Sequence, residues 1–198
     1  TPTGYANSPN PDGLVDHDVP VLRVDGADGK PRAVLFGYAC HNTTLALYQI
    51  CGDYAGYAQQ YFQEKHPEAM ALFMSGCGGD QNPYPRGTLE LAQLHGRTLA
   101  VAVDAALQTR ALPLTGPLRL AYEEIDLDYA GPPKRADYEA KLTSKDRFEV
   151  QHAERMIARL GRDVKLPEKY PFPVQLVQIG PTLTLVALAG ETVVDYSL

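Results

Sequence analysis

Three polar segments follow apolar runs of the sequence, and together they hold the residues best suited to chemistry. They span residues 40–44, 75–83 and 189–192. A short apolar run bounded by turn residues is typical of a buried strand. In open α/β sheets, ligands bind beyond the carboxyl ends of the strands. We therefore expect these three segments to lie at one edge of a sheet and to form the functional site.

Two residues in these segments could bind a metal ion. His41 ends a predicted buried strand, where an imidazole can ligate zinc, act as a base or serve as a structural hydrogen-bonding group. Glu191 follows Gly190 after another apolar run. Its carboxylate could ligate zinc, act as a general base or satisfy free N–H groups at the start of a helix. On the same sheet edge, the two residues favour a metal-binding pair. The other histidines are expected at the surface or at interfaces: His17, His66, His95 and His152.

The segment 75–83 is rich in glycine, and its backbone amides could form an anion-binding nest. It lacks the Lys-Ser/Thr ending of a phosphate-binding P-loop, which argues against nucleotide binding. Cys77 could be a nucleophile with His41 as its base, or it could be a buried, unreactive thiol. No G-x-S-x-G segment is present, so the pattern does not favour a serine hydrolase.

Alternating elements position these segments. Strands are predicted at 19–24, 33–40 and 69–74, the last two covered on both faces. Helices are predicted at 54–65, with Asp53 as N-cap, and at 88–109, with Thr88 as N-cap. The first helix should bury Ala55, Ala58 and Phe62, with Tyr61 as a further candidate, and the second should bury Leu91, Leu94, Thr98, Val101 and Ala105.

The second half of the chain changes character. A strand at 117–128 precedes a charged stretch that predicts helices at 133–144 and 146–160, and two strands follow at 174–179 and 183–188. The fold class is therefore α/β, with a mixed β-sheet flanked by helices and a helical insert around 130–165. The second insert helix should bury a stripe of Phe148, His152, Met156, Ile157 and Leu160.

Composition limits the functional classes. The 198 residues carry a formal net charge of −6 without a block of Lys or Arg, which argues against a nucleic-acid partner. No apolar run approaches the ~20 residues of a transmembrane helix. The three cysteines, Cys40, Cys51 and Cys77, match no CxxC zinc pattern and leave the redox state open. The length fits a single α/β domain over residues 1–198, and both ends look cut, so we expect a fragment of a longer protein.

Four motifs in this order resemble the N-terminal catalytic domain of the neutral/alkaline ceramidases. The resemblance covers most of the chain and is weakest over 110–170. The motifs are His41-Asn42-Thr43-Thr44, Asp53-Tyr54-Ala55-Gly56-Tyr57-Ala58, Gly79-Asp80-Gln81-Asn82-Pro83 and Gly190-Glu191.

The resemblance implies a zinc amidohydrolase, in which zinc activates water or polarises the amide carbonyl. His41 and Glu191 match two zinc ligands of the family, and the remaining ligands are expected outside this chain. The family serine falls on Asn82, which cannot form an acyl intermediate but could orient water or donate to the substrate carbonyl. Asp80 and Arg86 complete the expected catalytic set, with Arg86 able to hold a substrate carbonyl or carboxylate.

The expected substrate is a small-molecule or lipid amide, with ester hydrolysis as a related possibility, and the resemblance alone favours secretion or the periplasm. Two other functions fit the same residues. The chain could be a non-catalytic binding domain, which Asn82 and the missing ligands favour, or a thiol hydrolase that uses Cys77 and His41. The sequence does not predict an oligomeric state.

Overall fold

The computed structural model of the chain describes residues 8–131, 134–162 and 167–197. The chain divides into two compact units. The first comprises Thr1–Pro113 and Gly190–Leu198, and the second comprises Leu114–Ala189. Within the described ranges, no helix combines the length and hydrophobicity that a membrane span requires.

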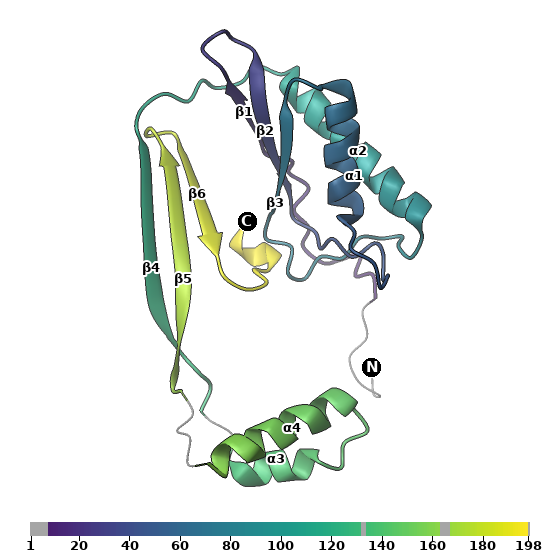
Figure 1. The fold of residues 1–198 in the computed structure, drawn as a ribbon, viewed down its shortest axis with the longest axis vertical. Helices are drawn as coiled ribbons and strands as arrows, with labels where there is room; N and C mark the ends of the chain where they lie inside the picture. Colours follow the sequence, from purple (N-terminus) through teal and green to yellow (C-terminus); the bar gives the residue numbers. More distant parts are fainter. Residues whose placement is uncertain (1–7, 132–133, 163–166, 198) are drawn as a thin grey trace. The chain divides into compact units, whose positions relative to one another are not determined.

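The first unit is a three-stranded mixed sheet with two helices on one face (Figure 1). β1 (Val21–Asp25) pairs antiparallel with β2 (Pro31–Tyr38), and β2 pairs parallel with β3 (Met70–Ser75). Helix α1 (Asp53–Lys65) connects the parallel strands, and α2 (Leu89–Leu107) follows β3. Because β2 and β3 are parallel, the loops after them leave from the same edge of the sheet.

The core of this unit lies between the sheet and the two helices. Val34 and Phe36 of β2 are almost fully buried and belong to one cluster with Ala58 and Phe62 of α1 and Val103 of α2. The predicted burial of Ala55, Ala58 and Phe62 is confirmed. The prediction that β3 is covered on both faces is wrong: Ala71 is buried, but its neighbours Met70 and Leu72 are exposed.

The buried face of α2 also differs from the prediction, because Leu94 and Val101 lie outside it and small residues share it with Leu99 and Val103. Leu94 and Val101 are 57% and 60% exposed. A Cβ atom at Gly96 would lie 2.7 Å from the Tyr54 carbonyl oxygen and 2.9 Å from the Ala58 nitrogen, so the helices approach closely through glycine. Small residues therefore take much of the inner face, which consists of Ala92, Gly96, Leu99, Ala100 and Val103.

The start of α2 is as predicted. Thr88 is the N-cap residue, and its hydroxyl accepts a hydrogen bond from the Leu91 N–H at 3.3 Å. This bond satisfies one of the backbone donors that a helix leaves free in its first turn.

The second unit is an antiparallel sheet with a helical insert. β4 (Leu118–Asp128), β5 (Lys169–Ile179) and β6 (Leu183–Leu188) pair in chain order. Between β4 and β5, the chain forms α3 (Arg135–Lys141) and α4 (Arg147–Leu160). The predicted α/β class and helical insert are confirmed.

Two features of the second unit differ from the sequence analysis. First, β4, β5 and β6 form a sheet of their own and do not extend the mixed sheet. Second, Phe148 was expected on the buried stripe of α4, but its side chain is 79% exposed and Ala153 is buried instead. The helix therefore packs through a small residue and turns Phe148 outward.

Two glycine substitutions should have opposite effects on stability. Gly96→Ala should destabilise the chain by about 1–3 kcal/mol, since the added methyl would overlap the backbone of α1. Gly56→Ala, also within a helix, meets no atom within 4 Å and should stabilise by roughly 0.5–1 kcal/mol through helix propensity. Urea unfolding of both variants measures the difference, and equal midpoints would contradict the close packing at Gly96.

Candidate functional site

The loops that follow β2 and β3 are joined by their backbones. The His41 N–H donates to the Gln81 carbonyl at 2.9 Å, and the Gly87 N–H donates to the Thr44 carbonyl at 2.7 Å. Gly78 is needed for this contact, because a Cβ atom there would lie 2.5 Å from the Cys40 nitrogen. The glycine-rich segment therefore permits close approach of two chain segments.

A third segment, which follows β6, completes the site. The Gly79 N–H donates to the Thr192 carbonyl at 2.8 Å, and the Val194 N–H donates to Asp80 Oδ1 at 3.0 Å. A Cβ atom at Gly79 would overlap the carbonyl group of Glu191. This segment leads into a short 3-10 helix, Val194–Tyr196. Asp80 thus holds the backbone that carries Glu191.

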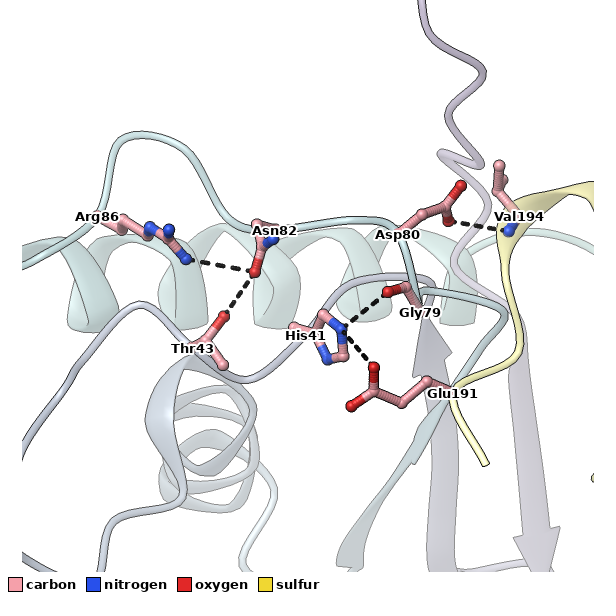
Figure 2. Close-up of polar contacts among 8 residues, drawn as sticks. All are labelled: His41, Thr43, Gly79, Asp80, Asn82, Arg86, Glu191 and Val194. Carbon is pink, nitrogen blue, oxygen red and sulfur yellow. Dashed lines mark hydrogen bonds and ion pairs between the residues drawn. The ribbon is translucent and has the colours of Figure 1, made fainter. Parts of the chain in front are cut away.

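The side chains of His41 and Glu191 face each other in Figure 2. His41 Nε2 lies 3.8 Å from Glu191 Oε2 and 3.1 Å from the Gly79 carbonyl oxygen. The imidazole is 28% exposed and the carboxylate 77% exposed, so a ligand can reach both groups from solvent. The sequence placed these two residues together, and the structure brings them into contact distance.

Asn82 is oriented by two neighbours. Its Oδ1 accepts hydrogen bonds from Thr43 Oγ1 at 3.0 Å and from an Arg86 Nη at 3.3 Å (Figure 2). Because the amide oxygen is occupied, the two Nδ2 hydrogens remain as donors. Within the described residues, no protein acceptor takes them. The amide therefore presents donors from a fixed position.

The electrostatics of Asp80 fit a holding role. Its slight burial acts to raise the pKa of the carboxyl group, but hydrogen bonds from the Val194 N–H and the Gln81 side chain outweigh this effect. The net result is a pKa below the ordinary value for aspartate. The carboxylate therefore stays ionised, and able to accept the Val194 N–H, to lower pH than a free aspartate.

Sequence reasoning missed the role of Asp53. The N-cap position of α1 is Gly52, and Asp53 is the first helical residue, with φ of +53°. Its buried carboxylate accepts hydrogen bonds from three backbone N–H groups, those of Thr44 at 3.1 Å, Leu45 at 2.8 Å and Tyr54 at 2.7 Å. Asp53 therefore fixes the loop after His41. Aspartate at a helix start was a visible signal, but its long-range partners were not.

The donor groups can be tested against the zinc that the resemblance implies. In the part of the chain that the structure describes, no group of three or more His, Cys, Asp and Glu side chains could hold a metal ion. Two atoms that each lie about 2.0–2.2 Å from one zinc can be no more than ~4.3 Å apart. The 3.8 Å between His41 Nε2 and Glu191 Oε2 meets that limit. The pair thus fits two positions of a zinc site, provided that Nε2 gives up its contact with Gly79.

The cysteines have different surroundings, and all three are free thiols. Burial raises the pKa of Cys40 to about 11. Cys77 is half-buried, and no hydrogen bond joins it to His41 among the described residues. His41 Nε2 lies instead beside Gly79 and Glu191. The contacts of His41 therefore give no support to a thiol nucleophile.

A cavity of about 540 Å³ opens beside Asn82 in the first unit. Its walls include three tyrosines, Tyr38, Tyr54 and Tyr84, and no Asp, Glu, Lys or Arg side chain contributes to the lining. A space of this kind suits an uncharged, largely apolar group. Asn82 belongs to the lining and is also hydrogen-bonded to Thr43 and Arg86 of the loops.

The first unit belongs to the α/β class, with polar loops that converge beyond parallel strands, and two solved structures with a similar fold are ceramidases. The neutral ceramidase from Pseudomonas aeruginosa matches with a TM-score of 0.57 and 17% identity over 89% of this chain and 36% of that chain. A ceramidase complexed with C2 matches equally well, over 89% of this chain and 37% of its own. The resemblance stated from the motifs is confirmed at the level of the fold.

Two further facts bound this comparison. The chain spans about a third of the length of these solved structures. No family model matches the sequence, and no curated protein matches it.

Removing the carboxylate of Asp80 should release the segment that carries Glu191. In Asp80→Ala, hydrogen exchange of the Val194 N–H should accelerate roughly fivefold to tenfold, since a net hydrogen bond contributes about 1 kcal/mol. Asp80→Asn keeps an oxygen acceptor and is the matched control. Unchanged exchange at Val194 in Asp80→Ala would show that the segment is held by other contacts.

Proposed function

We propose that this chain carries part of the site of a metal-assisted hydrolase that cleaves amide or ester bonds, as ceramidases do, and that it belongs to a longer hydrolase domain. The observation that carries the proposal is the 3.8 Å approach of His41 and Glu191 within a ceramidase fold. Two loops far apart in sequence meet there, and several backbone bonds hold them in place.

His41 and Glu191 would hold a zinc ion, with the remaining ligands supplied by residues outside this chain. Bound there, zinc supplies Lewis-acid chemistry, by lowering the pKa of water or polarising a carbonyl group. Before a metal binds, the His41 imidazole is held beside the Gly79 carbonyl and the Glu191 carboxylate. The two side chains therefore lie close to each other already, and Nε2 would leave the Gly79 carbonyl when the ion binds.

Asn82 would act on the substrate through its Nδ2 hydrogens. Thr43 and Arg86 occupy its oxygen, so the amide can donate to a carbonyl oxygen as negative charge develops there. Arg86 adds a positive charge beside Asn82 and could contact the same oxygen. Asp80 acts as a positioning residue, because its carboxylate holds the Val194 backbone.

The cavity beside Asn82 supports a lipid-like amide as substrate. Its lining combines aromatic and aliphatic side chains with polar ones, among them His17, His95 and Thr98, and has no Asp, Glu, Lys or Arg. An apolar chain could occupy this space while the amide group lies near Asn82. The reaction would then take place beside Asn82, on the side of the loops that carry the exposed His41 and Glu191 side chains.

Zinc titration of the chain tests the ligand pair. Two protein ligands are fewer than the three that catalytic zinc sites keep, so calorimetry should show weak binding by the 198-residue chain. His41→Ala should remove that binding, whereas His152→Ala, in the second unit, should not. Tight stoichiometric binding by the chain alone would contradict the proposal that further ligands lie outside it.

Replacement of Asn82 tests the hydrolytic mechanism in a longer protein that contains this chain. Asn82→Ala should lower kcat about 100- to 1,000-fold while zinc content stays the same, because an oxyanion donor is lost. Asn82→Ser should retain activity, since a hydroxyl can still donate. Asn10→Ala is a control, because the Asn10 amide oxygen accepts, among the described residues, only from the nearby Asp12 N–H. Normal turnover of Asn82→Ala would leave this residue with a structural role.

A further inference from the structure

The outer face of α4 carries a continuous row of basic and aromatic side chains. Phe148, Arg155 and Arg159 follow one another at intervals of seven and four residues, which places them on one stripe of α4, and Arg162 follows three residues later in the turn after the helix ends at Leu160. All four are exposed, and Phe148 is 79% exposed. The opposite face packs through the buried Ala153.

The three arginines have no acidic partner among the described residues. Four of the five acidic side chains in residues 134–162 have partners elsewhere in the insert, and the fifth, Glu154, is exposed and forms no ion pair with the three arginines. Glu139 pairs with Arg135 at 2.8 Å, and Glu149 accepts from Ser144 at 2.6 Å. Asp137 and Asp146 accept backbone N–H groups at the starts of α3 and α4. The three arginines therefore form no ion pair within the described residues, and Glu154 is the one acidic residue of α4 that is left without a partner there.

The charge of the insert is opposite to that of the whole chain. Residues 134–162 contain eight Lys and Arg and five Asp and Glu, a formal charge of +3, whereas the chain carries −6. The arginine row also borders a shallow hollow of about 490 Å³. It is lined by His152, Arg155, Met156, Ala158, Arg159 and Arg162. The hollow thus combines cationic groups with the apolar surface of Met156 and contains no acidic group.

We propose that this face of α4 docks on an anionic lipid surface. Arginine side chains bind phosphate oxygens through paired N–H donors, and an exposed aromatic ring among them can enter the boundary between headgroups and acyl chains. An acidic protein would satisfy the arginines. It would not by itself account for Phe148, which stands on the same row with little protein contact. The proposal does not depend on the proposed hydrolase activity.

Vesicle sedimentation tests this proposal with the 198-residue chain. The chain should bind vesicles of phosphatidylcholine mixed with phosphatidylglycerol and should bind pure phosphatidylcholine vesicles much less. Added salt should weaken binding, because it screens the attraction between exposed charges. The triple variant Arg155→Gln, Arg159→Gln, Arg162→Gln should bind on the order of 100-fold more weakly, at about fivefold per arginine. Phe148→Ser should weaken binding at least ~10-fold through lost apolar burial.

Matched variants separate the row from net charge and from folding. One control is a triple variant that makes the same change of charge elsewhere, with the substitutions Lys30→Gln, Arg110→Gln and Arg119→Gln. It should bind the vesicles nearly as well as the original chain. Replacing the three row arginines by lysine keeps the positive charge but removes the paired donors, so it should weaken binding much less than replacement by glutamine does. Because Arg159 and Arg162 also complement the dipole at the end of α4, circular dichroism must show unchanged helix content in the glutamine variant.

Three outcomes would overturn the proposal. Equal binding to both kinds of vesicle would remove the electrostatic basis. Equal loss in the control triple variant would show that net charge, and not the α4 row, is responsible. In the third outcome, the chain is retained on heparin but fails to bind vesicles, and the retention is lost in the triple glutamine variant. That result would assign the face to a polyanion or an acidic protein instead of a lipid surface.

Discussion

The carboxylate of Asp53 holds the start of α1 and the loop after β2 at a single point. It accepts three backbone N–H groups, from Thr44, Leu45 and Tyr54. A buried carboxylate is costly unless hydrogen bonds replace its water, and here three donors do so. Tyr54 in turn donates through its hydroxyl to the Cys40 carbonyl at 2.7 Å. The segment that carries His41 is thus held to α1 on both sides. Its backbone bond to the Gln81 carbonyl joins it to the loop after β3.

Close approach between backbones is the second constraint, and glycine makes it possible. Gly78 lies against the end of β2, Gly79 against the Glu191 segment and Gly96 against α1. At Gly78 and Gly79, a Cβ atom would come within hard contact of a neighbouring backbone, and overpacking of that kind is destabilising. A glycine-rich sequence suggests flexibility or an anion nest. Its role here is to let two segments touch, which a single sequence cannot reveal because the neighbouring segment is distant in the chain.

The sequence predicted those parts of the structure that depend on local pattern. Apolar runs marked the strands, Thr88 marked the start of α2, and polar residues after apolar runs marked the loops that carry His41 and Asn82. The predictions failed where packing partners decide the outcome. The inner face of α2 was misplaced because hydrophobicity favoured Leu94, while the nearby helix required Gly96. Phe148 was placed inside for the same reason, although Ala153 allows closer packing. Sheet membership also could not be deduced, because β4 to β6 resemble additional strands of one sheet.

The candidate site joins residues that are far apart in sequence, since Asp80 bonds to Val194 and the whole second unit lies between them in the sequence. Such contacts form only after the intervening chain has been closed into a loop, which slows folding more than it reduces stability. The entropic cost of closure rises with the logarithm of loop length, by about 0.6 kcal/mol for each doubling. The long stretch of folded chain between β3 and the Glu191 segment, which includes the second unit, therefore costs little stability. The contacts of Asp80 and Gly79 can hold Glu191 in place whatever the length of this stretch. The second unit can therefore carry a separate surface, such as the arginine row of α4.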